Sequence, residues 1–278
     1  MNFEYIKNPD GAWGLYNKEI GDIYFSNIGA YKEALEKFVL PANPKSIKNK
    51  KIKILDVCYG MGYNSKTFVD YCVKNNLLFD FHIDFVENDE KILALGLLNF
   101  DKNISSNVHL YFGKEILSKI YFSQNTNLIL GENWIKDFLR ENMLIFDANS
   151  KEINDILFKT DDLNNILHNI YYQNHTLSNN FSLSLGISWK IKDLIADFQK
   201  LEKGYDLIFH DAFSIRKQPE MWTEQIFSRY YQILNSGGKL LTYSNSRVVR
   251  RILEGIGFIV ETNFDENNKQ NGTIAIKT

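Results

Sequence analysis

A short apolar run that passes directly into a glycine turn is the feature that most constrains this sequence. The pattern around it repeats once, in this order: strand Lys53–Val57, turn Cys58–Gly62, helix 63–75, strand Phe81–Val86 ending on Glu87, helix 89–99. Short apolar runs of this kind are typical of buried parallel strands. The order of strand, glycine turn, helix, strand and acid therefore predicts the first half of a doubly wound α/β sheet.

The same alternation returns after residue 200. We expect these elements: strand Tyr205–His210, helix Glu220–Leu234, strand Lys239–Tyr243, helix Ser246–Gly255, strands Phe258–Glu261 and Gly272–Ile276. Gly237 and Gly238 end the long helix and turn the chain into the next strand. We expect the last two strands to form a hairpin that bends back into the sheet.

Residues 114–180 interrupt this alternation. Apolar residues continue there at helical intervals, which predicts an insertion of several short helices within a single domain spanning residues 1–278. A lid, a substrate-binding cap and a dimer surface all remain open for it, and the oligomeric state stays undetermined. With 44% apolar residues, a chain of this length can bury one sizeable core.

Charge and cysteine content narrow the function classes. A net charge of −2 gives no global positive field for nucleic acid, so any RNA contact must come from a local patch. Cys58 and Cys72 lack metal-ligand spacing to other Cys or His residues, and we expect both to be small buried hydrophobes and no metal site. No apolar run reaches the roughly 18 residues of a membrane span. The first ten residues also lack the apolar core of a signal peptide, and we expect a cytoplasmic protein.

The glycine turn has the form Asp56-x-x-x-Gly60-x-Gly62. Glycine lacks the Cβ that would hold a nucleotide-like ligand away, and Asp56 can order the loop or accept a hydrogen bond from the ligand. An ordinary helix residue, Thr67, stands near the place of the third glycine of the dinucleotide pattern, which disfavours a pyrophosphate cofactor. A purely structural tight turn is the alternative.

Glu87 strengthens the ligand interpretation. An acid at the end of the second strand can accept both hydroxyl groups of a ribose. The alternative is an exposed carboxylate that favours the positive end of the following helix. Strand, turn and acid together predict nucleoside binding.

A second cluster spans His210–Thr223 (HDAFSIRKQPEMWT). Asp211 stands at the carboxyl end of a strand, where it can orient an amine and accept its proton. Arg216 and Lys217 could face a phosphate, and Trp222 could form an aromatic wall. In the alternative, the two cations are solvated and Trp222 belongs to the core.

This cluster, the turn sequence GMGYN and the early segment Asp22–Asn27 (DIYFSN) resemble the methyltransferase half of the bifunctional enzyme that completes 5-methylaminomethyl-2-thiouridine at the tRNA wobble position. Gly237-Gly238 and Arg250-Arg251 follow in the family's order. The resemblance covers most of residues 20–113 and 181–262. It implies a Rossmann-like class I S-adenosylmethionine-dependent methyltransferase sheet with helices on both faces.

The family's reaction would be methylation of the aminomethyl group of 5-aminomethyl(-2-thio)uridine, with tRNA as the partner. The resemblance implies catalytic roles for Asp211 and Lys217. The implied cofactor-binding residues are Tyr24, Phe25, Ser26, Asp56, Gly60, Gly62, Asn64, Glu87 and Ser188. The implied substrate-binding residues are Phe213, Pro219, Trp222, Arg247, Arg250 and Arg251.

The sequence also departs from the family pattern, which is approximately Gly-Phe-Gly-Thr-Gly-x-Asn at the turn. Met61 replaces the threonine, and Ile215 replaces the first proline of the long cluster. Gly186-Ile187-Ser188 stands where the family has Gly-Asp, which leaves adenine recognition to Ser188 or to the backbone. The family's basic tail and the flavin-binding oxidase half have no counterpart in this sequence.

Two other functions remain open. One is an aminopropyl transferase of the spermidine-synthase type, although Arg216 and Lys217 beside Asp211 disfavour a dicationic substrate. The other is a noncatalytic nucleoside-binding relative, which Met61 and Ile187 make plausible. Binding of S-adenosylmethionine and of its decarboxylated form separates these possibilities.

Overall fold

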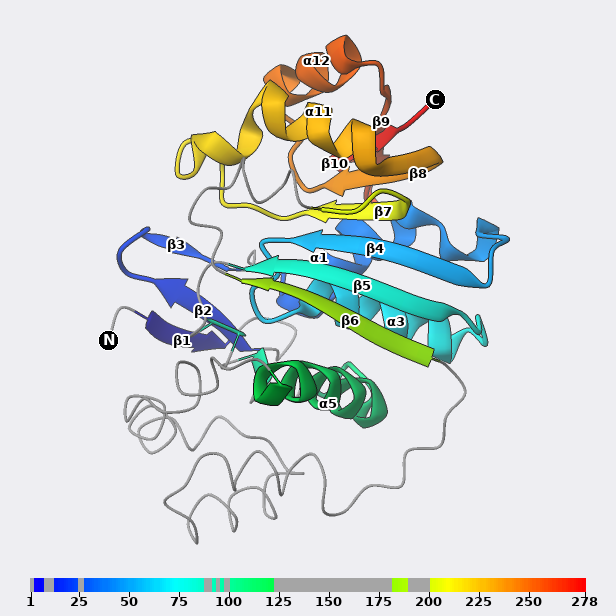
Figure 1. Ribbon diagram of the computed structural model, residues 1–278. Helices are drawn as coiled ribbons and strands as arrows, with labels where there is room; N and C mark the ends of the chain where they lie inside the picture. Colours follow the sequence, from blue (N-terminus) through cyan, green and yellow to red (C-terminus); the bar gives the residue numbers. More distant parts are fainter. Residues whose placement is uncertain are drawn as a thin grey trace, which may run out of the picture.

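A computed structural model describes residues 3–7, 13–24, 28–87, 92–93, 96–97, 101–122, 182–189 and 201–278. Seven strands form the central sheet in the order β6-β5-β4-β7-β8-β10-β9 (Figure 1). Their bounds are β4 Lys51–Val57, β5 Asp80–Glu87, β6 Ser182–Trp189, β7 Tyr205–His210, β8 Leu234–Thr242, β9 Ile259–Phe264 and β10 Gln270–Ile276. Strands β4 to β8 pair in parallel, whereas β10 is antiparallel to both β8 and β9. The predicted doubly wound sheet and its terminal hairpin are therefore confirmed.

Helices cover both faces of this sheet, because successive side chains of a strand point to opposite sides. Ile54 and Phe209 pack into one buried cluster with Phe68 of α3, and their strand neighbours Leu55 and Ile208 pack into a second cluster. Side chains of α11 and α12 complete the second cluster. The helical segments are α1 Ala30–Ala34, the π-helical turn Leu35–Val39, α2 Leu40–Ala42, a 3₁₀ turn Pro44–Ser46, α3 Tyr63–Lys74, α5 Ser106–Phe122, a 3₁₀ turn Pro219–Trp222, α11 Glu224–Ile233 and α12 Arg247–Ile256.

The largest boundary differences from the sequence-based expectation lie at the start of α11 and the start of β8. The helix expected from Glu220 begins only after Thr223, whose hydroxyl accepts a hydrogen bond from the Ile226 amide at 3.4 Å as an N-cap. Strand β8 begins at Leu234, before the glycine pair, and its pairing with β7 shifts register there. The chain therefore passes from helix to strand without a separate turn.

An N-terminal sheet of three antiparallel strands was absent from the sequence-based expectation. It comprises β1 Phe3–Lys7, β2 Trp13–Asn17 and β3 Asp22–Ile23. Figure 1 shows this sheet near one end of the central sheet. Its last strand leads into Tyr24, which contacts the candidate site described below.

The predicted helical insertion cannot be compared in full with the structure. Helix α5 continues through residue 114 to Phe122, and residues 123–180 lie outside the described residues. Of the expected helix 89–99, residues 92–93 and 96–97 are described and are helical. Within the described part of the chain, no helix combines the length and apolar character that a bilayer crossing requires.

Candidate active site at the ends of β4, β5 and β7

The glycine turn lies at the carboxyl end of β4, beside the end of β5. The Gly60 amide donates a hydrogen bond of 2.7 Å to Glu87 Oε2, so the turn and the second-strand acid meet directly. Gly62 adopts φ 81°, and a Cβ there would stand 2.2 Å from the Tyr59 hydroxyl oxygen. Only glycine fits at that position. Glu87 is 6% exposed, so its alternative interpretation as a solvated carboxylate does not describe this structure.

Asp56, near the end of β4, connects this strand to the helix that follows the glycine turn. Its carboxylate is fully buried, and Oδ2 accepts a hydrogen bond of 2.5 Å from the Ser65 hydroxyl in the first turn of α3. Burial raises the pKa of Asp56 well above its ordinary value, and the Ser65 hydrogen bond opposes that shift. Oδ1 has no hydrogen-bond partner among the described residues, which leaves one buried acceptor at the ligand-binding end of the sheet.

Cys58 occupies an unusual place in the same turn. It adopts φ 62°, a left-handed conformation that favours glycine, at the position of the first glycine in the related family pattern. Cys72 is buried as expected, whereas Cys58 is only partly buried. Burial raises the pKa of the Cys58 thiol well above its ordinary value, and the charges of Glu87 and Asp211 add to the shift. The thiol is therefore the neutral form at physiological pH.

Asp211 lies directly after β7 and is joined to the cofactor turn. Asn64 Nδ2 donates a hydrogen bond of 2.8 Å to Asp211 Oδ2, and the Asp211 amide donates to the Val57 carbonyl at 3.2 Å. Burial raises the pKa of Asp211 to about 7, the charge of Glu33 adds to the rise, and the Asn64 hydrogen bond and the charge of Lys37 oppose it. A carboxyl group with this pKa can exchange a proton near neutral pH.

Glu33 and Lys37 are site residues that the sequence-based analysis missed. They form an ion pair of 2.5 Å with 13% exposure on each side, and Lys37 Nζ lies 5.5 Å from the centroid of the Tyr243 ring. The Tyr243 hydroxyl donates to the carbonyl of Ala212, the residue after Asp211, at 3.0 Å. Both residues therefore lie near enough to Asp211 for their charges to affect its pKa.

One signal in the sequence could have drawn attention to this helix. Lys37 lies in the π-helical turn Leu35–Val39. Pro41 follows four residues after Lys37 and has no amide hydrogen to donate to the Lys37 carbonyl. π-Helical turns are rare and often mark functional sites.

The long cluster after Asp211 is held mainly by its own atoms. The amides of Lys217 and Gln218 donate to the Ser214 carbonyl at 2.8 and 2.9 Å. Trp222 Nε1 donates to the Phe213 carbonyl at 2.7 Å, and the indole ring packs against His210 with ring centroids 4.7 Å apart. Trp222 is 4% exposed, as in its core interpretation, so its contact with substrate stays a prediction.

Lys217 connects this cluster to the N-terminal sheet. Its Nζ donates to the Ile20 carbonyl at 2.6 Å and to the Gly21 carbonyl at 3.4 Å, in the turn between β2 and β3. Tyr24 then contacts the Phe213 ring edge-on, with centroids 5.0 Å apart, and a Cβ on Gly60 would lie 3.7 Å from Tyr24 Cδ1. Tyr24 and Phe213 therefore border the glycine turn together. A direct catalytic role for Lys217 stays a prediction.

The remaining predicted residues lie apart from this group or outside the described residues. Phe25 and Ser26 lie outside them, and of Ser188 the backbone is described, paired with Val86 in β6. Pro219 is exposed at the start of its 3₁₀ turn.

The three arginines predicted to bind substrate lie on α12, which packs against α11 and the edge strand β9. Arg250 donates from Nη1 to Thr262 Oγ1 at 2.6 Å, whereas Arg247 and Arg251 are exposed.

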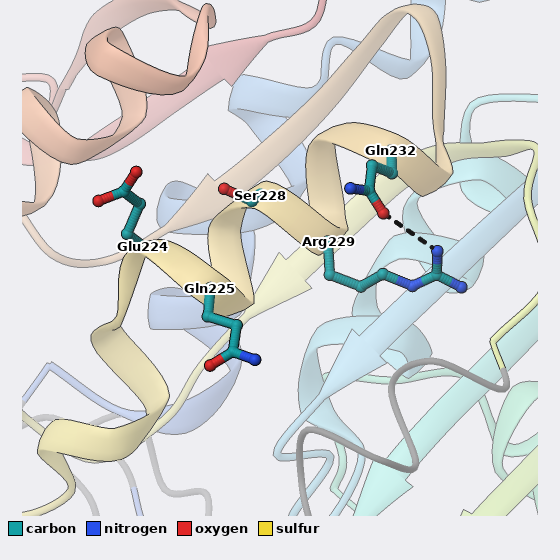
Figure 2. A pocket seen from close by; sticks show the side chains of 5 residues that line it. All are labelled: Glu224, Gln225, Ser228, Arg229 and Gln232. Carbon is teal, nitrogen blue, oxygen red and sulfur yellow. Dashed lines mark hydrogen bonds between the residues drawn. The ribbon is translucent and has the colours of Figure 1, made fainter.

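A hollow on the outer face of α11 is separate from these residues. Figure 2 shows it lined by Glu224, Gln225, Ser228, Arg229 and Gln232. Arg229 donates to the Gln232 side chain at 3.3 Å and to the Leu201 carbonyl at 2.8 Å. None of the residues predicted for the site lines this hollow.

The described geometry fits a nucleoside and gives no sign of a metal centre. Glu87 lies beside the turn at the end of β5, and Gly62 keeps the turn free of a Cβ. Parallel sheets bind nucleotide-like ligands at this place. Among the residues that the structure describes, no group of three or more His, Cys, Asp or Glu side chains could hold a metal ion.

Comparison with known proteins supports this interpretation. Residues 159–278 match a family model described as S-adenosyl-L-methionine-dependent methyltransferase. A protein of Methanocaldococcus jannaschii, "Uncharacterized protein MJ0670", is 27% identical over 272 residues, which is 98% of this chain and 59% of that protein. This chain thus spans about three fifths of that relative's length.

Two other matches are to proteins named MnmC and MNMC2. A segment of 58 residues, 21% of this chain, is 45% identical to the tRNA 5-methylaminomethyl-2-thiouridine biosynthesis bifunctional protein MnmC of Nitrosospira multiformis and covers 9% of that protein. The crystal structure of MNMC2 from Aquifex aeolicus has a TM-score of 0.61 at 23% identity, over 99% of this chain and 70% of that one. Residues 159–278 thus match the family of S-adenosyl-L-methionine-dependent methyltransferases, and the mostly parallel seven-stranded sheet is the class I fold of the MNMC2 structure.

Proposed function

We propose that this enzyme methylates the primary amine of a 5-aminomethyl uridine, with or without the 2-thio group, at the wobble position of tRNA. The observation that carries the proposal is the hydrogen bond between Asn64 and Asp211. It joins the predicted proton acceptor after β7 to the helix that begins at the glycine turn. The sequence similarity to the MnmC proteins supports the choice of substrate.

S-adenosylmethionine, when bound, would supply a methyl group on a positively charged sulfur: the neutral amine would form a bond to the methyl carbon, and the sulfur would leave as the neutral thioether of S-adenosylhomocysteine. Glu87, whose carboxylate accepts from the Gly60 amide at the turn, would also accept hydrogen bonds from the ribose hydroxyls. The rings of Tyr24 and Phe213 beside the turn attract positive charge through their faces. These residues hold the reactants, and positioning supplies much of the acceleration in such a transfer.

Asp211 is the proposed base, which removes a proton from the amine that receives the methyl group. A primary amine is mostly protonated near neutral pH, and only its neutral form has the lone pair that forms the new bond. An ionised Asp211 carboxylate can hold the ammonium group and accept one proton from it. Because its pKa lies at about 7, the carboxylate is available as a base in the physiological range.

The direct test is methylation of tRNA that carries 5-aminomethyl-2-thiouridine, followed by mass spectrometry of the nucleosides. We expect one added methyl group on that nucleoside and none with unmodified tRNA. Decarboxylated S-adenosylmethionine with putrescine forms a parallel arm. Aminopropyl transfer in that arm would favour the spermidine-synthase alternative. Cofactor binding without any transfer would favour the noncatalytic alternative.

The tRNA contact is tested separately through α12. Arg247 and Arg251 are exposed, and neutralising both to Gln should lower the log–log salt dependence of tRNA binding by up to about 2. Arg250→Gln is the control, because that guanidinium is already engaged with Thr262 and should change the slope less. Equal slopes for the double variant and the parent would assign these arginines to a solvated face.

A further inference from the structure

Lys66 is a buried lysine that the proposed mechanism does not use. It lies on α3 one turn after the glycine turn and is 5% exposed. Lysine is almost never fully buried unless it is paired, because removing an ammonium group from water is costly. The surroundings of this side chain therefore call for an explanation.

Two backbone carbonyl groups satisfy the Lys66 side chain. Nζ donates to the Met61 carbonyl at 3.0 Å and to the Gly96 carbonyl at 2.9 Å. Met61 is the residue between the two glycines of the turn, and Gly96 belongs to the helical residues that follow β5. The Lys66 side chain thus connects the turn after β4 to the segment after β5.

Gly96 also packs directly against Met61. A Cβ at Gly96 would lie 3.0 Å from Met61 Cα and 3.1 Å from the Met61 carbonyl oxygen, closer than such contacts normally allow. Met61 itself is fully buried. The Lys66 hydrogen bonds therefore connect two segments that are already in close contact. Both acceptors are main-chain carbonyl groups, so they do not depend on the side chains of Met61 or Gly96.

We propose that Lys66 is a positioning residue, which holds the Met61 peptide against the Gly96 segment and so pre-forms the turn for the nucleoside of S-adenosylmethionine. This inference rests on the proposed cofactor site at the turn. Holding the turn in its bound shape before the ligand arrives lowers the ordering cost of binding. Burial lowers the pKa of Lys66 to about 7, and the charge of Asp101 opposes that shift. The environment is thus dry, and its hydrogen bonds are correspondingly expensive to lose.

The central experiment compares Lys66→Met with the parent protein. Methionine has a similar length and no donor, so both carbonyl groups lose their partner. We expect the dissociation constant for S-adenosylmethionine to rise roughly tenfold, because binding must then also order the turn. In the cofactor-free protein, hydrogen exchange at the Gly60 and Gly62 amides should become faster.

The control and a second variant make the result specific. Lys74→Met removes another lysine of α3, one that pairs with Asp70 at 2.6 Å and donates to the Asn103 carbonyl at 2.9 Å away from the turn. It should leave the dissociation constant and the exchange rates of the turn unchanged. Gly96→Ala keeps Lys66 but forces the Gly96 segment away from Met61, which displaces one of the two Lys66 acceptors, and it should also weaken cofactor binding.

Unchanged cofactor affinity and unchanged exchange in folded Lys66→Met would overturn the proposal. If Lys66→Met does not fold, Gly96→Ala decides, and parent-like affinity in that variant overturns the proposal equally. A parent protein that binds no S-adenosylmethionine would refute the proposed cofactor site and this role together. A parent that binds, with variants that bind equally well, would refute this role alone.

Discussion

The two loops of the candidate site are built in opposite ways, although they follow neighbouring parallel strands. The loop after β7 is stabilised locally, through hydrogen bonds of Gln218 and Trp222 to backbone atoms of Ser214 and Phe213. The turn after β4 depends on side chains from other elements. Glu87 of β5 accepts from its Gly60 amide, and Lys66 of α3 binds its Met61 carbonyl.

This difference explains why one loop is easier to recognise than the other. A locally stabilised loop requires a contiguous string of residues, and the string from His210 to Thr223 is the most specific part of the family resemblance. A turn held from outside tolerates changes in its own side chains. Met61 is accommodated there, because its side chain is buried and the stabilising contacts are made by its main chain.

The comparison also separates two expected roles, binding at the turn and chemistry at the loop. Asp211→Asn should break the chemical role with the largest effect, because the amide cannot accept the proton. We expect the methyl-transfer rate to fall by a factor of about 10² to 10⁴ while cofactor affinity stays nearly unchanged. Single-turnover assays and calorimetric titration measure the two quantities.

Asp206→Asn provides a matched control for that variant. Asp206 lies near the start of β7, where its side chain accepts from the Lys53 amide at 2.9 Å. Its replacement should leave turnover per folded molecule intact. Loss of cofactor binding in Asp211→Asn, or full turnover, would refute the division of roles between the two loops.

Glu87→Gln tests the turn and should produce the next largest effect. The glutamine amide offers one acceptor oxygen where the Gly60 amide and a ribose both require acceptors. Cofactor binding should weaken by roughly 1.5 to 3 kcal/mol. Titration calorimetry provides the number, and an unchanged dissociation constant would leave Glu87 with only its structural role at the turn.

The smallest expected effects concern the pH dependence of the reaction, which is described first for the parent protein. Asp211 must be ionised to accept a proton, and its pKa lies at about 7. The value of kcat/KM should therefore fall as the pH decreases through about 7, and it should level off above that pH. A profile that is flat between pH 5 and 9 would contradict the role of Asp211 as the base.

The Glu33–Lys37 pair allows this profile to be moved in both directions. Three further titratable groups, Asp56, Cys58 and Tyr243, lie close enough to Asp211 for its charge to raise their pKa values, and both variants leave them unchanged. Glu33→Gln removes a negative charge that raises the pKa of Asp211, so the acidic limb should move to lower pH. Lys37→Met removes a positive charge that lowers this pKa, and the limb should move to higher pH. Shifts of the same sign in both variants would exclude an electrostatic effect of the pair.

The sequence by itself determined the elements and the acids at their ends. Apolar periodicity identified β4, α3, β5, β7 and the terminal hairpin, because burial of one face imposes a fixed spacing on neighbouring residues. Glu87 and Asp211 could be singled out for a related reason, since each follows directly on a buried strand.

The tertiary structure alone decided which distant groups meet. Asn64 and Asp211 are 147 residues apart, and the contact between Lys217 and Ile20 spans 197 residues. No local pattern encodes such distances, which is why Glu33, Lys37 and Lys66 escaped the sequence analysis. The same reason applies to Trp222: its helical spacing allowed both a core and a substrate-facing position, and only the structure shows that the ring packs against His210, while its contact with substrate stays a prediction. Periodicity records which face of an element is buried, whereas the partner on that face follows from how the whole sheet is assembled.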